Sequence, residues 1–162
     1  MSREIMIRFA GAEDLAALVV FNRAMARETE SKELVVEVVS AGVSALLEKP
    51  ELGFYLVAEQ QGEVVGSLMV TTEWSDWRNG TFWWIQSVYV LPKARRQGIY
   101  RRLYEFVKME AEKQENVCGF RLYVERENIP AQMTYSSLGM IETRYKVYEE
   151  LRQNKKFFES AA

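Results

Sequence analysis

The sequence has 162 residues, a length typical of one domain, and 48% of them are apolar, enough for a buried core rather than a disordered chain. The formal net charge of −2 excludes general charge-driven binding to nucleic acid or to a membrane surface. Histidine is absent and Cys118 is the single cysteine, which excludes Ser-His-Asp and Cys-His catalysis and a disulfide framework, and predicts no metal site. We expect a single domain over residues 1–162, with a polar tail over residues 152–162.

The first half of that domain begins with a predicted strand over residues 5–9, where apolar side chains alternate. A helix is expected from about Asp14 to Arg27, because acidic residues favour a helix start and an apolar face follows. A second helix is expected over residues 32–48, with Ser31 as its N-cap.

Three apolar segments then follow at short intervals, over residues 54–60, 63–72 and 81–90. Gln61-Gly62 is a tight-turn signal, and residues 74–80 form the next loop. Connections this short favour an antiparallel meander.

The last part of the chain predicts a helix from Gly98 to about Glu115 and a strand over residues 120–124. Two strands joined by a long helix favour a parallel pair. A short helix over residues 131–138 follows, with Pro130 in its first turn and Gly139 as its C-terminal cap. Residues 140–149 predict one or two final strands, and Cys118 is expected to be a small core residue.

The junction over residues 83–104, WWIQSVYVLPKARRQGIYRRLY, places a basic turn with a glycine between a buried strand and a helix. The first turn of a helix has backbone N–H groups without internal partners, and its dipole favours negative charge. Glycine allows close approach, and arginines match phosphate oxygens. The turn therefore predicts an anion site for phosphate or pyrophosphate, although such junctions also occur without any ligand.

The residues of this turn resemble a known family signature. Arg95-Arg96-Gln97-Gly98-Ile99-Tyr100 is similar to the acyl-coenzyme A signature of the GNAT superfamily of N-acetyltransferases, Gln/Arg-x-x-Gly-x-Gly/Ala. Tyr100 stands where the family usually has glycine or alanine, so its ring is expected to point away from the phosphates.

A second segment, from Asn128 to Met140, resembles the other GNAT hallmark, Asn-x-x-Ala-x-x-x-Tyr-x-x-x-Gly-Phe, with methionine in place of the final phenylalanine. The resemblance covers residues 5–149. It implies an α/β (α+β) fold, in which a mixed, mostly antiparallel sheet of six to seven strands, splayed between the fourth and fifth, is flanked by about four helices.

The resemblance also implies acetyl transfer from acetyl-CoA, as acyl-donor cosubstrate, to a primary amine by direct attack in a ternary complex. Tyr135 would protonate the leaving thiolate, and Asn128 would contact the pantetheine. The remaining cofactor-binding residues implied are Ser87, Val88, Val90, Arg95, Arg96, Gln97, Gly98, Ile99, Tyr100 and Arg101.

The acceptor side is less defined by the residues. Glu28 is the first candidate for the general base and Glu73 the second, and a water polarised by Gln86 or a backbone carbonyl is an alternative. Glu28, Trp74, Trp84 and Gln86 are the candidates for substrate binding. Glu28 could equally be a solvated helix end, Trp74 could cover the edge of the core, and Tyr135 could simply pack under the sheet.

The partner predicted is an amine-bearing small molecule or a peptide, with a homodimer as a further possibility, in the cytoplasm and without nucleic acid or membrane. Two other functions fit the same residues, namely a non-catalytic acyl-CoA-binding module and a protein-interaction domain that keeps only the fold.

Overall fold

The computed structural model describes residues 4–153 and 156–159. By their internal contacts, residues fall into two compact units, one of residues 1–122 with 157–162, and one of residues 123–156. The single-domain organisation expected from the length stays a prediction. In the polar tail, residues 154–155 and 160–162 lie outside the described residues.

The first unit begins with strand β1 (Ile5–Phe9), a short 3-10 turn η1 (Ala12–Asp14) and helix α1 (Leu15–Glu30), followed by helix α2 (Val36–Glu48). The prediction that Ser31 caps the second helix is wrong, because Ser31 has a left-handed φ of 53° and ends α1. Residues 33–35 stay extended because Val35 N–H donates to Phe157 O at 2.9 Å, and Glu159 N–H donates to Glu33 O.

A single sheet continues through β2 (Gly53–Gln60), β3 (Glu63–Ser75), β4 (Gly80–Val90) and β5 (Val117–Arg121), in the spatial order β1-β2-β3-β4-β5. The first four strands pair antiparallel and β5 pairs parallel with β4, as predicted. The β3–β4 hairpin is longer than expected, so Trp74 lies in a strand rather than a loop. Strand β5 begins three residues before the predicted one, and Cys118 is exposed on it rather than in the core.

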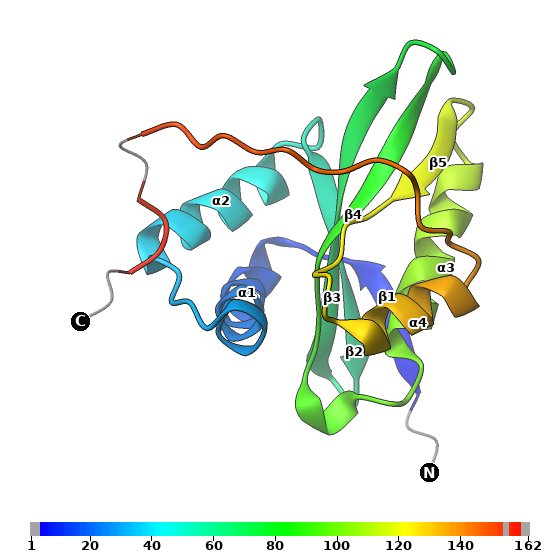
Figure 1. Ribbon diagram of the computed structural model, residues 1–162. Coiled ribbons are helices and arrows are strands. Elements are labelled where there is room, and N and C mark those ends of the chain that lie inside the picture. The colour runs from blue at the N-terminus through cyan, green and yellow to red at the C-terminus, as the bar shows by residue number, and fades with distance from the viewer. Residues whose placement is uncertain (1–3, 154–155, 160–162) are drawn as a thin grey trace. The chain divides into compact units, whose positions relative to one another are not determined.

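Each face of the sheet is covered by different helices (Figure 1). Helices α1 and α2 cover one face, where Leu18, Val43 and Leu46 pack with Tyr55 and Val57 of β2. Helix α3 (Ile99–Glu112) covers the other face with its buried residues. On that side the ring of Phe9 meets those of Phe54 and Phe106 edge-on at 5.3 and 5.7 Å, and Phe54 likewise meets Trp83.

Strand β4 changes its pairing along its length. The last residue of β4 that pairs with β5 is Trp84, opposite Arg121, although β4 itself continues to Val90. The sheet therefore opens on this side beyond Trp84, which agrees with the expected splay between the fourth and fifth strands. The chain reaches β5 through α3, so the opening lies directly before the loop that starts this helix.

A β-bulge lies in the same part of β4. The register with β3 shifts between Ser67, opposite Tyr89, and Met69, opposite Gln86, and Ser87 has a left-handed φ of 51°. A bulge inserts one residue and so exchanges the faces of the residues after it. Trp83 accordingly packs on the α3 side, whereas Tyr89 meets Phe21 of α1 on the opposite side, with ring centroids 5.3 Å apart.

The second unit contains helix α4 (Ile129–Ser137). Asn128 caps it, because its Oδ1 accepts from Ala131 N–H at 3.3 Å, and Pro130 sits in the first turn as predicted. Gly139, with φ 99°, ends it through bonds from Gly139 N–H to Ser136 O and from Met140 N–H to Tyr135 O. The predicted helix, with Pro130 in its first turn and Gly139 as its C-terminal cap, is confirmed, whereas Asn128 was not predicted as its N-cap.

The prediction of final strands over residues 140–149 is wrong, because no strand is assigned there in the described residues. The sheet therefore has five strands instead of six to seven. Large apolar side chains in and just beyond this segment are exposed, including Ile141, Tyr145, Val147 and Tyr148. Strand propensity alone does not form a strand, since it depends on packing against a paired neighbour.

Candidate active site

The loop between β4 and α3 has the backbone geometry of an open cradle. After a 3-10 turn η2 (Pro92–Ala94), Arg96 and Gly98 take left-handed φ values of 62° and 74°. Buried Ala94 and Ile99 anchor the loop at both ends, while residues 95–98 are exposed. A β-carbon built on Gly98 would meet nothing within 4 Å, so the space over this residue is open.

The first turn of α3 follows directly after this open position at Gly98. The helix begins after Gly98, whose carbonyl accepts from Arg102 N–H at 3.1 Å. The amides that come before Arg102 therefore lie ahead of the first regular helical hydrogen bond. Tyr100, the residue that departs from the family signature, has its ring stacked on that of Tyr104 at 6.1 Å, one turn further along α3. Gln97 accepts at Oε1 from Gln60 Nε2 at 3.0 Å, which ties the loop to the β2–β3 hairpin.

The unpaired side of β4 lies just before this cradle. Ser87, Val88 and Val90 all follow Trp84, the last residue of β4 that pairs with β5. Ser87 lies in the bulge, where one residue drops out of the regular ladder. Strand backbone without a neighbouring strand can accept an extended ligand as an added strand.

Glu28, near the C-terminal end of α1, is held against this loop. Its Oε2 accepts from Arg95 Nη2 at 2.8 Å, and its Oε1 accepts from Tyr89 Oη at 2.9 Å. The Arg95 guanidinium beside it holds the pKa of the Glu28 carboxyl below its ordinary value, with the Tyr89 hydroxyl adding to this. A lowered pKa and two occupied oxygens make Glu28 a poor proton acceptor.

Glu73 of β3 forms a second carboxylate cluster, at the start of the sheet opening. Its Oε1 accepts from Arg121 Nη1 at 2.7 Å and from Trp84 Nε1 at 3.2 Å. Arg121 reaches it across β4, with its guanidinium 3.6 Å from the ring centroid of Phe82. Sequence reasoning missed both Arg121 and Phe82, because Arg121 comes from β5, which is far along the chain from the β3–β4 hairpin that holds Glu73 and Phe82.

The predicted acceptor residues divide between the two faces of the sheet. Trp84 pairs with Thr71 and Gln86 with Met69, so both share the face of Glu73, which pairs with Phe82. Gln86 donates from Nε2 to Thr71 Oγ1 at 2.6 Å, which fixes its amide on that face. Trp74, the next residue after Glu73, points to the opposite face and is 60% exposed. The structure therefore groups Trp84 and Gln86 with Glu73, and separates Trp74 from them.

In the second unit, Tyr135 lies in the last turn of α4 and is half-buried. Burial raises the pKa of its phenol, so the group stays protonated at neutral pH. Gln132 fixes the approach to this helix by donating from Nε2 to the carbonyls of Glu125 and Arg126, at 3.2 and 2.8 Å.

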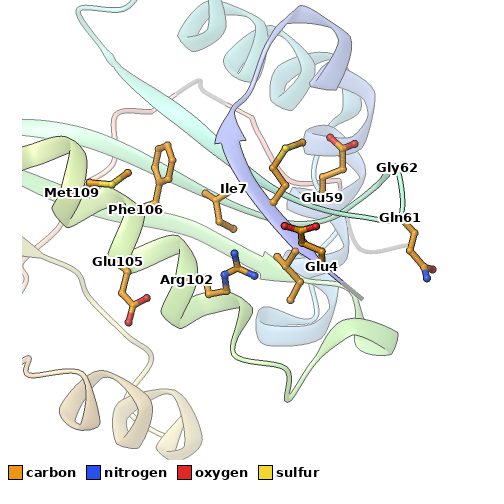
Figure 2. A pocket seen from close by; sticks show the side chains of 11 residues that line it. Glu4, Ile7, Glu59, Gln61, Gly62, Arg102, Glu105, Phe106 and Met109 are labelled. Carbon is orange, nitrogen blue, oxygen red and sulfur yellow. The ribbon is translucent and has the colours of Figure 1, made fainter. Parts of the chain in front are cut away.

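A separate hollow of about 750 Å³ lies between the edge strand β1 and α3 (Figure 2). Ile7, Phe106 and Met109 provide apolar surface in it, and Arg102 and Glu105 are among its polar residues. None of the predicted site residues lines this hollow.

Two features are absent from the described part of the chain. No helix in it combines the length and the apolar character needed to cross a membrane. In the same residues, no three His, Cys, Asp or Glu side chains are grouped as a metal site.

Comparison with known proteins agrees with this geometry. Residues 19–140 match the Acetyltransferase (GNAT) family, so the chain belongs to that family and is an acyltransferase. A possible acetyltransferase from Clostridium difficile 630 is 49% identical, with a TM-score of 0.85, and the match covers 91% of this chain and 97% of that one. No curated protein matches the sequence.

More distant structures share the fold. The aminoglycoside N-acetyltransferase AAC(6')-Iy in complex with CoA is 15% identical with a TM-score of 0.76, and the match covers 94% of this chain and 97% of that one. A predicted acetyltransferase with acetyl-CoA from Clostridium acetobutylicum is also 15% identical, with a TM-score of 0.75 and coverage of 91% and 96%.

Proposed function

We propose that this protein transfers an acetyl group from acetyl-CoA to a primary amine by direct attack in a ternary complex. The observation that carries the proposal is the open first turn of α3, with left-handed Arg96 and Gly98, placed directly after the unpaired end of β4. The amides of residues 97–101 and the Arg96 side chain hold the pyrophosphate. The backbone of Ser87, Val88 and Val90 bonds the pantetheine, which Asn128 also contacts.

The chemistry then needs one base and one acid. The acceptor ammonium, with a pKa of about 10, must lose a proton before its nitrogen can attack. Glu73 takes this proton, directly or through a water held by Gln86, because Arg121 and Trp84 both bond to its Oε1, so that Oε2 can accept the proton. The C–N bond forms as the C–S bond breaks, the sulfur leaves with the electron pair, and the nitrogen releases its second proton to solvent to give the neutral amide. Tyr135 protonates that thiolate, because a phenol with a pKa of about 10 is protonated at neutral pH, and the phenolate then takes a proton from solvent.

The acceptor is a small molecule or peptide that carries a primary amine. Trp84 and Glu73 offer an aromatic face and a carboxylate on one side of the sheet, which suits a cationic group. The distant structures support this class only by analogy, since one of them is the aminoglycoside enzyme AAC(6')-Iy in complex with a bisubstrate analogue.

Isothermal titration with acetyl-CoA tests the cofactor, and a thiol-release screen over amino acids, polyamines, aminoglycosides and peptides tests the acceptor. We expect saturable acetyl-CoA binding and release of CoA with at least one amine. Tyr135→Phe should lower kcat by about 100-fold while acetyl-CoA binding stays unchanged, because general acid catalysis contributes on this order. Lack of binding at millimolar acetyl-CoA would contradict the proposal, whereas binding without turnover of any amine would favour a non-catalytic binding module.

A further inference from the structure

We propose that Glu28 is a positioning residue, which holds the pyrophosphate-binding loop in its binding geometry through Arg95. This inference rests on the proposed use of the loop for CoA, and it gives Glu28 a role other than that of the general base. Arg95, the first residue of the signature, makes the contacts that support this role.

The Arg95 side chain acts within the protein instead of pointing to the ligand space. Its Nε donates to Val90 O at 2.9 Å, and its Nη2 donates to Glu28 Oε2 at 2.8 Å. The first bond ties Arg95 to Val90, the last residue of β4. The second ties the loop to α1, which is far away in sequence. Arg95 is therefore held by both β4 and α1, directly before the amides at the start of α3.

Tyr89 completes the arrangement. Its hydroxyl donates to the other oxygen of Glu28 at 2.9 Å, and the Arg95 guanidinium lies 5.6 Å from the centroid of its ring. Three groups from α1, β4 and the loop thus fix one another. A ligand loop that is ordered before binding loses less conformational entropy when it binds, and so binds more tightly.

The neighbouring arginine has a different environment. Arg96 follows in a left-handed conformation and is exposed, so its guanidinium is the one available to phosphate oxygens. The carboxylate of Glu28 lies near a site for an anion, which by charge alone weakens the binding of that anion. Bracing and simple repulsion therefore predict opposite effects when the charge of Glu28 is removed.

The test measures CoA binding by isothermal titration for the wild-type protein, Glu28→Gln, Arg95→Met and the double variant, with Glu30→Gln as the matched control on the exposed end of α1. We expect Glu28→Gln and Arg95→Met each to weaken CoA binding by about tenfold, because the loop is no longer ordered in advance. The double variant should be no weaker than either single one, since both remove the same brace. Glu30→Gln should bind CoA as the wild type does.

Kinetics provide a second readout that a general base would move differently. With the amine selected by the screen, Glu28→Gln should raise KM for acetyl-CoA and leave kcat within about twofold. Unchanged or tighter CoA binding in Glu28→Gln would overturn this inference but not the proposed function. A fall in kcat at constant KM would do the same. Failure of the wild-type protein to bind CoA would overturn the proposed function, and with it this inference.

Discussion

Strand β4 is flanked by two carboxylate clusters that look alike but are bonded differently. Glu28 accepts from Arg95 and from Tyr89 on its two separate oxygens. Glu73 accepts from Arg121 and from Trp84 on one oxygen, Oε1. In each case an arginine and an aromatic donor hold the carboxylate, and both carboxylates are similarly exposed, at 41% and 44% of their side-chain surface.

Solvent exposure therefore does not separate the two clusters, but the use of their oxygens does. Glu28 has a bond on each of its oxygens and is the proposed brace, whereas Glu73 keeps one oxygen for a further bond. The difference teaches that a carboxylate next to a ligand site is a candidate base only if an oxygen is left for the substrate. It also means that the two glutamates should fail in different ways when they are changed.

A third pair, Asp14 with Arg8, provides the reference for a structural role and the largest expected effect. Asp14 is 4% exposed and accepts two bonds from the Arg8 guanidinium, at 2.8 and 3.0 Å, and one from Gly11 N–H. Asp14→Ala should lower the free energy of unfolding by about 3 kcal/mol, because breaking a buried pair leaves its partner's charge less compensated. Urea denaturation measures this.

Glu13→Ala is the control, since Glu13 is 72% exposed and 3.9 Å from the same guanidinium, and it should change stability by less than about 0.5 kcal/mol. The bond from Arg8 lowers the pKa of Asp14 from its ordinary 3.8. Because the folded-state pKa is the lower one, this stability is fully present above pH 3.8 and is lost as the pH falls through the folded value. An equal pH dependence in Asp14→Ala and the wild type would contradict this assignment.

Glu73→Gln should have the largest effect on the reaction. We expect kcat to fall by about 100-fold, with acetyl-CoA binding unchanged, because glutamine cannot take the proton of the ammonium. The free energy of unfolding should change by less than about 1 kcal/mol, as exposed ion pairs contribute little. Steady-state kinetics and thermal unfolding check the two parts. If kcat survives in Glu73→Gln, a water activated elsewhere is the base and the contrast with Glu28 disappears.

Gly119→Ala tests the Glu73 cluster by displacing the ring on which Arg121 rests. A β-carbon at Gly119 would lie 2.7 Å from Cε1 of Phe82, the ring on which Arg121 rests. Displacing this ring should cost about 2 kcal/mol of stability through overpacking. It should also raise KM for the amine and leave CoA affinity unchanged. Gly42→Ala, at a glycine with nothing within 4 Å of the added carbon, is the matched control.

Tyr89→Phe should have the smallest effect. It removes the hydroxyl that donates to Glu28 but keeps the ring that packs on Phe21 and lies beneath Arg95. We expect CoA to bind about threefold more weakly, since one net hydrogen bond of ~0.7 kcal/mol is lost and the salt bridge remains. Titration with CoA measures this. A loss greater than that of Glu28→Gln would mean that Tyr89, and not Glu28, orients the loop.

How much of the structure could be predicted from the sequence depends on how far apart in the chain the interacting residues lie. The turn at Gly98 and the C-terminal cap of α4 at Gly139 were predictable, because each depends on a few consecutive residues. The cluster around Glu73 was not, because Arg121 reaches it over β4 from a strand nearly 50 residues away. Ser31 was assigned to the wrong helix for the same reason, since residues 33–35 are held by a strand-like contact with 157–159.

The bulge at Ser87 has a further consequence for how this strand tolerates insertions and deletions. The bulge adds one residue to β4 between Gln86 and Tyr89, so these two side chains share a face although they are three positions apart. Removal of residue 87 or 88 would therefore restore a regular ladder, with Tyr89 still opposite Ser67 and still facing Phe21 of α1. Removal of a residue between Thr81 and Gln86 would instead turn one end of β4 by about 180° against the other, a change that no single substitution there could produce.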